Sequence, residues 1–191
     1  MRLFLAGPLP EAVQAEVQAA VETVRRAACQ VAWVPKGQLH LTLAFLGEVA
    51  PSDVPPLSDA LRPVAARHQR LELVLRGAGC FGRPRQPEVL FAEVAGESEG
   101  LVALATDIRA ALGGLVVQPA RSIVQPFHPH LTLARARARH GDAALAVCQR
   151  ALRDRRWGAF LLDRVVLFHS EARGAGRVHT PLVEYPLGSI R

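Results

Sequence analysis

The sequence lacks the features that would indicate several common classes of protein. Its three cysteines are far apart and form no Cys-x-x-Cys motif, which argues against a disulfide framework or a zinc knuckle. Its apolar stretches are short and broken by charge or proline, so none is long enough to span a membrane. The apolar run at the start is too short for a signal peptide, and we interpret it as a first strand. We therefore expect a cytoplasmic protein.

Lysine is almost absent, and arginine carries the positive charge. Lys36 is the sole lysine among 23 basic side chains, which exceed the 17 acidic ones and give a net charge of +6. A guanidinium is a planar fork that matches the oxygens of a phosphate. The charge therefore favours an anionic partner such as RNA, although arginine richness is also compatible with genome composition or heat tolerance.

Hydrophobic periodicity predicts an α+β chain. Apolar residues at helical spacing predict helices at about 10–29, 53–64, 99–112 and 142–152. Alternating or β-branched runs predict strands at about 2–6, 31–34, 39–46, 71–76, 89–94, 131–135, 161–168 and 178–185. Half of the residues are hydrophobic, which is ample for a core. We expect residues 1–191 to form a single domain made of two pseudo-symmetric lobes around a shared cleft.

One short motif occurs twice, at His40–Ala44 and again, letter for letter, at His130–Ala134. The two copies are about half a chain apart, and each lies in a predicted strand that is followed by a predicted helix. A single histidine or threonine in a strand is usually structural. The repetition in matching contexts instead indicates an internal duplication, with two equivalent strands about a pseudo-two-fold axis.

Strand geometry gives the repeated motif a chemical meaning. Because side chains alternate along a strand, the histidine and threonine of each copy point to one face and the leucines to the other. Two such faces across a cleft bring two imidazoles and two hydroxyls to one point. The hydroxyls can donate to phosphoryl oxygens, and one neutral and one protonated imidazole can act as base and acid near pH 7. The pattern predicts a phosphoesterase site that needs no metal, with His40, Thr42, His130 and Thr132 as its candidate catalytic residues.

Three other motifs suggest different chemistry but have weaker support. The stretch Gly77–Gly82 fits G-x-G-x-x-G, but prolines follow it where a dinucleotide site needs a helix, so we interpret it as a loop. His128 and His130 could be two metal ligands on one strand face, but no carboxylates or further histidines cluster near them. Ser170 lacks the flanking glycines of a nucleophile elbow.

The motifs and their flanks resemble those of the 2H phosphoesterases, and more closely the RNA 2′,3′-cyclic phosphodiesterases, also called 2′–5′ RNA ligases. The resemblance is carried by Arg2–Ala6, His40–Glu48, Pro126–Arg135 and Val165–Leu187. It implies a bilobal, duplicated α+β fold in which two antiparallel β-sheets line a central cleft, with helices on the outside. It also implies hydrolysis of a 2′,3′-cyclic phosphate at an RNA end to a 2′-phosphomonoester, without a metal or cofactor.

The resemblance implies roles for single residues. In such enzymes the first histidine is the proton donor and the second the acceptor, so His40 would protonate the departing 3′ oxygen and His130 would activate water. The sequence alone leaves that order open, because the two copies are locally alike. Arg135 matches the family's arginine after the second motif, but strict alternation points it away from His130 unless the strand bulges or ends there. His179 stands where the family's last loop often carries an aromatic residue.

The expected partner is RNA with 2′,3′-cyclic phosphate ends, or cyclic nucleotides, bound by a monomer. Phe45 and Phe127 are candidates to stack on bases, whereas Trp33 is interpreted as a core residue. Two alternatives remain open. The chain could be an RNA-end-binding module whose catalysis is incidental, or its reaction could be the reverse one, the 2′–5′ joining of RNA ends.

Overall fold

The computed structural model describes residues 1–113, 126–174 and 176–188 of the chain. Its helices and strands follow in the order β1 (Arg2–Pro8), α1 (Glu11–Arg25), β2 (Ala32–Trp33), β3 (His40–Glu48), α2 (Val54–Arg67), β4 (Leu71–Arg83), β5 (Gln86–Gly96), α3 (Ser98–Leu112), β6 (His130–Arg135), α5 (Ala143–Leu152), β7 (Arg156–Leu162), β8 (Arg164–Arg173) and β9 (Gly176–Pro186). Short 3-10 helices lie at Arg26–Ala28, Lys36–Gln38 and Pro51–Asp53.

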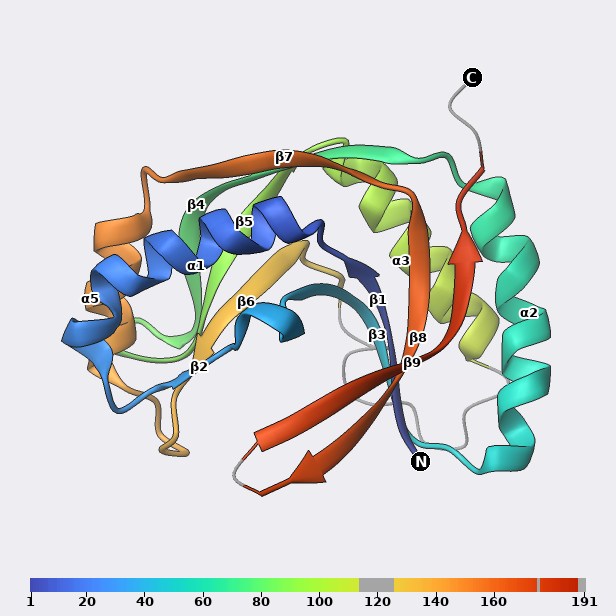
Figure 1. The fold of residues 1–191 in the computed structure, drawn as a ribbon, viewed down its shortest axis with the longest axis horizontal. Helices are drawn as coiled ribbons and strands as arrows, with labels where there is room; N and C mark the ends of the chain where they lie inside the picture. Colours follow the sequence, from blue (N-terminus) through green and yellow to red (C-terminus); the bar gives the residue numbers. More distant parts are fainter. Residues whose placement is uncertain (114–125, 175, 189–191) are drawn as a thin grey trace.

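The strands form two antiparallel sheets. One sheet has the order β3-β1-β8-β9 and the other the order β2-β6-β5-β4-β7. Helices α2 and α3 pack on each other and against the first sheet, while α1 and α5 pack against the second (Figure 1). The predicted fold class, an α+β fold with two antiparallel sheets and helices on the outside, is confirmed. The two motif strands, β3 and β6, belong to different sheets and approach each other in space.

The periodicities seen in the sequence explain this packing. Helix α1 buries one valine-rich stripe, which includes Val13, Val17 and Val24, as an amphipathic helix over a sheet should. Along β3 and β6 the motif leucines are fully buried, while the motif histidines and threonines are only partly buried. The motif strands therefore present their leucines to the core and their polar residues to the opposite face. Among the described residues, no helix is long and apolar enough to cross a membrane.

Two predicted segments differ from the structure. The stretch Gly77–Gly82, predicted as a loop, lies within β4 and remains paired with β5. Positive φ angles at Gly77 and Gly82 coincide with shifts in the pairing, so these glycines let the strand bulge without breaking. The single strand predicted at 161–168 is the end of β7 and the start of β8, because the chain passes from one sheet to the other at Asp163.

Candidate active site

The two motif strands carry a β-bulge at the same position. The pairing of β3 with β1 skips Leu43, and the pairing of β6 with β5 skips Leu133. In both strands the skipped leucine and the alanine after it are buried. The extra residue reverses the alternation of side chains from that point on. It therefore brings Phe45 and Arg135 to the same face as the histidines and threonines, and this is the bulge that the prediction for Arg135 required.

The two motif histidines are oriented by the same kind of backbone hydrogen bond. Nδ1 of His40 lies 2.7 Å from the carbonyl oxygen of Gln38, and Nδ1 of His130 lies 2.7 Å from that of His128. A carbonyl can only accept, so in each neutral ring Nδ1 carries the proton and donates it. Nε2 of each ring is therefore the nitrogen left to exchange protons with another group.

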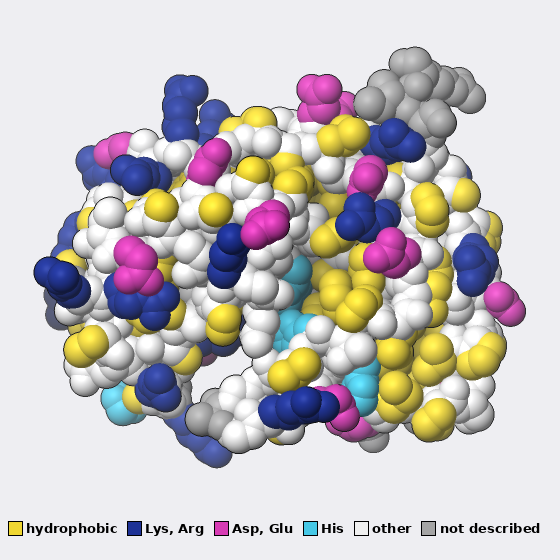
Figure 2. Space-filling model, in the orientation of Figure 1, with side chains coloured by type: hydrophobic (Ala, Val, Ile, Leu, Met, Phe, Trp, Pro, Cys, Tyr) yellow, Lys and Arg dark blue, Asp and Glu magenta, His cyan; other side chains and the backbone are white. Residues whose placement is uncertain are grey.

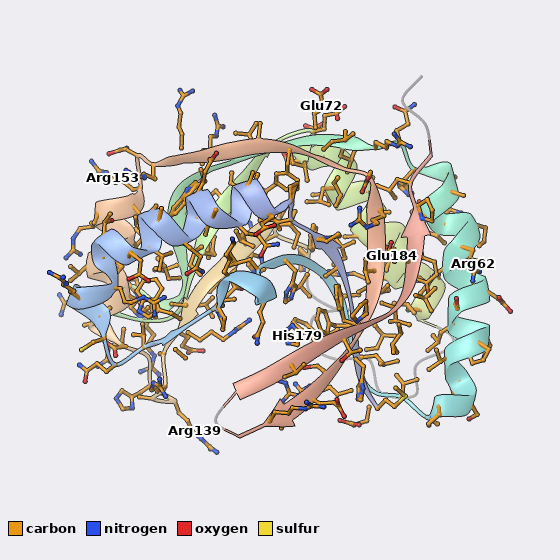
Figure 3. The ribbon with its side chains drawn as sticks, viewed as in Figure 1. Arg62, Glu72, Arg139, Arg153, His179 and Glu184 are labelled. Atoms are coloured by element: carbon orange, nitrogen blue, oxygen red, sulfur yellow. The ribbon has the colours of Figure 1, made fainter. Side chains whose placement is uncertain are left out.

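Aromatic side chains surround His40 in the first sheet. Its ring centroid lies 4.8 Å from that of Phe4 on β1, 6.4 Å from that of Phe168 on β8 and 5.3 Å from that of His179 on β9. Figure 3 labels His179 beside the hairpin of β8 and β9, where it is paired with Ser170. Nδ1 of His179 is buried and has no hydrogen-bond partner among the described residues. The first motif histidine thus lies in a largely apolar setting with a second imidazole edge-on to it.

A matching set of rings surrounds His130 in the second sheet. Its centroid lies 4.9 Å from that of Phe81 on β4 and 5.5 Å from that of Phe91 on β5. Phe91 can pack there because Gly79 is its partner on β4, where a Cβ would overlap the phenyl ring. Glycine at this point of β4 therefore makes room for the ring that packs beside His130.

Burial and charge perturb both motif histidines. Burial is the main cause that lowers the pKa of His40 from 6.5 to about 4. The hydrogen bond to Gln38 raises this pKa, whereas the charges of His179, Arg135 and His130 lower it further. Burial also lowers the pKa of His130, and the charges of His128 and Arg135 add to the effect. The pKa of His40 thus responds to Arg135 and His130 from the other sheet. This agrees with the approach of β3 to β6 in space.

The other predicted site residues divide into two groups. Thr42 and Thr132 are partly buried on the same faces as the histidines, and Phe45 lies beside Phe4, with ring centroids 6.0 Å apart. Phe127 packs against the core, and the guanidinium carbon of Arg109 lies 5.0 Å from the centroid of its ring. Within the described ranges it makes no ring contact with either motif histidine, so its stacking role stays a prediction.

Sequence reasoning missed the aromatic residues that line the site, which are Phe4, Phe81, Phe91 and Phe168. Each lies on a strand other than the two motif strands, and the sequence does not say which strands are neighbours. Once β1 and β5 are known to pair with the motif strands, Phe4 and Phe91 are found by alternation alone.

Two hollows adjoin β6, one near each end. One, of about 310 Å³, includes Glu93, Glu99 and His128 in its lining. The other, of about 510 Å³, includes Arg135, Arg137 and Arg139. Figure 2 shows histidine side chains in a depression near the middle of the molecule, beside a patch of hydrophobic side chains. In the part of the chain that the structure describes, no group of three or more His, Cys, Asp or Glu side chains is arranged to hold a metal ion.

Comparison with known proteins identifies the family. The model of the 2′-5′ RNA ligase superfamily matches residues 9–174. An RNA 2′,3′-cyclic phosphodiesterase of Thermus thermophilus is 39% identical over 143 residues, which are 72% of this chain and 70% of that protein. One from Methanothermobacter thermautotrophicus is 27% identical over 187 residues, 98% of this chain and 99% of that one.

Solved structures of proteins with a similar fold include two with high similarity over nearly the whole chain. TT0787 of Thermus thermophilus has a TM-score of 0.81 at 31% identity, with all of both chains covered. Escherichia coli LigT complexed with 3′-AMP has a TM-score of 0.76 at 26% identity, with 97% of each chain covered. The fold that carries the two motif strands is thus shared with these structures, and the chain belongs to the 2′-5′ RNA ligase superfamily.

Proposed function

We propose that this protein is an RNA 2′,3′-cyclic 3′-phosphodiesterase, which opens the cyclic phosphate at an RNA end to a 2′-phosphomonoester. The observation that supports this most directly is the pair of motif histidines. They come from different sheets, each has Nδ1 held by a carbonyl, and the pKa of one responds to the charge of the other. Two such imidazoles suit a reaction that needs one proton removed and another supplied.

The proposed reaction moves two protons. Nε2 of His130 takes a proton from water as its oxygen attacks the phosphorus, and the bond from phosphorus to the 3′ oxygen breaks. Nε2 of His40 gives a proton to that oxygen, which leaves as a hydroxyl. The assignment of donor and acceptor follows the family resemblance, because the two histidines have equivalent hydrogen bonds. Afterwards, proton exchange with solvent restores both rings.

The substrate supplies the charge that the acid needs. With a pKa of about 4 in the free protein, His40 is neutral at neutral pH. A bound phosphodiester is an anion, and a nearby negative charge raises the pKa of an imidazole. Binding therefore favours protonation of His40 when a leaving group is present. The hydroxyls of Thr42 and Thr132 would donate hydrogen bonds to the phosphoryl oxygens. The guanidinium of Arg135 would balance the negative charge of the phosphate.

The remaining parts of the proposal concern binding and setting. We propose that Phe45 and Phe127 contact bases, and that the substrates include RNA ends and cyclic nucleotides. The free thiols of Cys29, Cys80 and Cys148 suit a reducing compartment, and we propose a cytoplasmic monomer in which residues 1–191 act as one domain of two lobes. We further propose that neither a metal nor a cofactor takes part.

The test is an end-product assay. Purified protein is incubated in EDTA with an oligoribonucleotide that ends in a 2′,3′-cyclic phosphate. The product is examined by mass spectrometry before and after treatment with a phosphatase specific for 3′-phosphates, which leaves a 2′-phosphate in place. We expect a 2′-phosphomonoester, and a loss of at least about a hundredfold in kcat for His40→Ala and for His130→Ala. The control is His140→Ala, at an exposed position in the turn after β6. No turnover, or turnover only after metal is added, would contradict the proposal.

The same samples distinguish the alternatives. An RNA-end-binding module whose catalysis is incidental predicts tight, salt-sensitive RNA binding that survives both histidine substitutions. For the reverse reaction, the cyclic-phosphate oligonucleotide is mixed with one that carries a 5′-hydroxyl. A longer product that resists enzymes specific for 3′–5′ linkages would show 2′–5′ joining at the same site.

A further inference from the structure

The larger hollow beside β6 is lined by arginines. Its volume is about 510 Å³, and its lining includes Arg135 at the end of β6 and Arg137 and Arg139 in the turn that follows, opposite Glu88 and Val89 of β5. Among the residues that the structure describes, none of the three arginines forms an ion pair or a side-chain hydrogen bond. Their charge exceeds that of Glu88, so the hollow is suited to an anion.

The turn that carries these arginines is attached to β5 at both ends. The N–H of Ala136 donates to the carbonyl of Glu88 at 2.8 Å, and the N–H of Asp142 donates to the carbonyl of Pro87 at 2.9 Å. Gly141, with a φ of +89°, lies so close to β5 that a Cβ would overlap the backbone there. The turn is therefore held in place before any ligand binds, which reduces the ordering cost of using its side chains.

The hollow continues from the proposed catalytic residues. Arg135 lines it and also acts on the pKa of both motif histidines. Arg137 and Arg139 follow Arg135 by two and four residues along the chain. Their Cα atoms therefore lie at most about 7 Å and about 14 Å from that of Arg135. Figure 3 labels Arg139 at the outer end of this turn. A strand whose last phosphate lies at the histidines could thus continue past these arginines.

We propose, on the basis of the function inferred above, that Arg137 and Arg139 bind the RNA phosphate that precedes the cyclic one. A free cyclic nucleotide has a single phosphate, and the motif residues and Arg135 hold it. Only a strand brings a second phosphate into the hollow, where two guanidinium groups can make charge-assisted hydrogen bonds to it. The site therefore makes the protein prefer RNA ends to free cyclic nucleotides.

The test compares two substrates in one double variant, Arg137→Gln with Arg139→Gln. The substrates are a 2′,3′-cyclic mononucleotide and a trinucleotide ending in the same cyclic nucleotide. We expect kcat/KM for the trinucleotide to fall about tenfold and that for the mononucleotide to stay unchanged. The slope of log kcat/KM against log salt for the trinucleotide should also become shallower by about 0.7, the value expected when the protein neutralises one phosphate fewer on a single strand.

A matched control removes the same charge elsewhere on this half of the molecule. Arg150→Gln with Arg153→Gln alters the region of the far end of α5, where Arg153 is labelled in Figure 3. This control should leave both substrates unaffected, and an unchanged melting temperature would show that both double variants fold. An equal loss on the two substrates, or an equal loss in the control variant, would overturn the phosphate site. If the unsubstituted protein turns over neither substrate, the proposed function itself fails.

Discussion

His40 should make the folded protein sensitive to acid. Burial among aromatic rings lowers its pKa from 6.5 to about 4 on folding. Between these two values the unfolded chain binds a proton at residue 40 and the folded chain does not, so the free energy of unfolding decreases as the pH falls through this range. One pKa unit corresponds to about 1.4 kcal/mol, so this one ring would lower the free energy of unfolding by up to about 3 kcal/mol between neutral pH and about pH 4.

Urea unfolding of the unsubstituted protein and of His40→Asn, at about pH 7 and about pH 4, measures this effect. Both proteins should lose stability on acidification, because other groups also titrate, but the unsubstituted protein should lose up to about 3 kcal/mol more. Taking the difference between the two proteins cancels the titration of groups that do not interact with residue 40. An exposed-site control, His140→Asn, leaves His40 intact and should behave like the unsubstituted protein. Equal losses for His40→Asn and the unsubstituted protein would refute the view that folding buries a neutral ring at position 40.

Three further predictions concern particular groups. Burial lowers the pKa values of both His40 and His130. The pH profile of kcat/KM, which reports the free enzyme, should therefore peak below about pH 6.5, and a maximum in alkaline solution would contradict this. Gly141→Ala should destabilise the protein by about 1–3 kcal/mol in urea unfolding, because of its positive φ and the overlap with β5, whereas Gly37→Ala, with open space around it, should not. Burial raises the pKa of the Cys80 thiol to about 11, so iodoacetamide at about pH 8 should label Cys80 only after unfolding. Peptide mapping separates this label from that on the exposed Cys29, and rapid labelling of Cys80 in the native protein would contradict the prediction.

Much of the local structure could be predicted because it depends on neighbours in the sequence. Helical spacing of valines located α1, and alternation within each motif placed the leucines in the core and the histidines and threonines on the other face. The same reasoning failed where two strands meet without an obvious turn. The residues at 161–168 read as one strand, and only the sheet topology shows that Asp163 divides two strands of different sheets.

In the site, too, some features follow from the local sequence and others only from the pairing of strands. Nothing in the five letters of the motif reveals that the pairing skips Leu43 and Leu133, because a bulge is defined by the partner strand. Strict alternation therefore pointed Arg135 away from the histidines, whereas the structure places it on their face. The depressed pKa of His40 likewise depends on rings from β1, β8 and β9, which are far from it in the sequence.

By itself, then, the sequence determined most of the secondary structure, the α+β class and the four polar residues of the repeated motif, since these are properties of short stretches of chain. The tertiary structure alone decided which strands are neighbours, and therefore that two motif faces from separate sheets meet. It also decided that Arg135 joins them and that the turn after β6 holds further arginines beside a hollow. These features depend on contacts between residues distant in the chain, and no local pattern specifies such contacts.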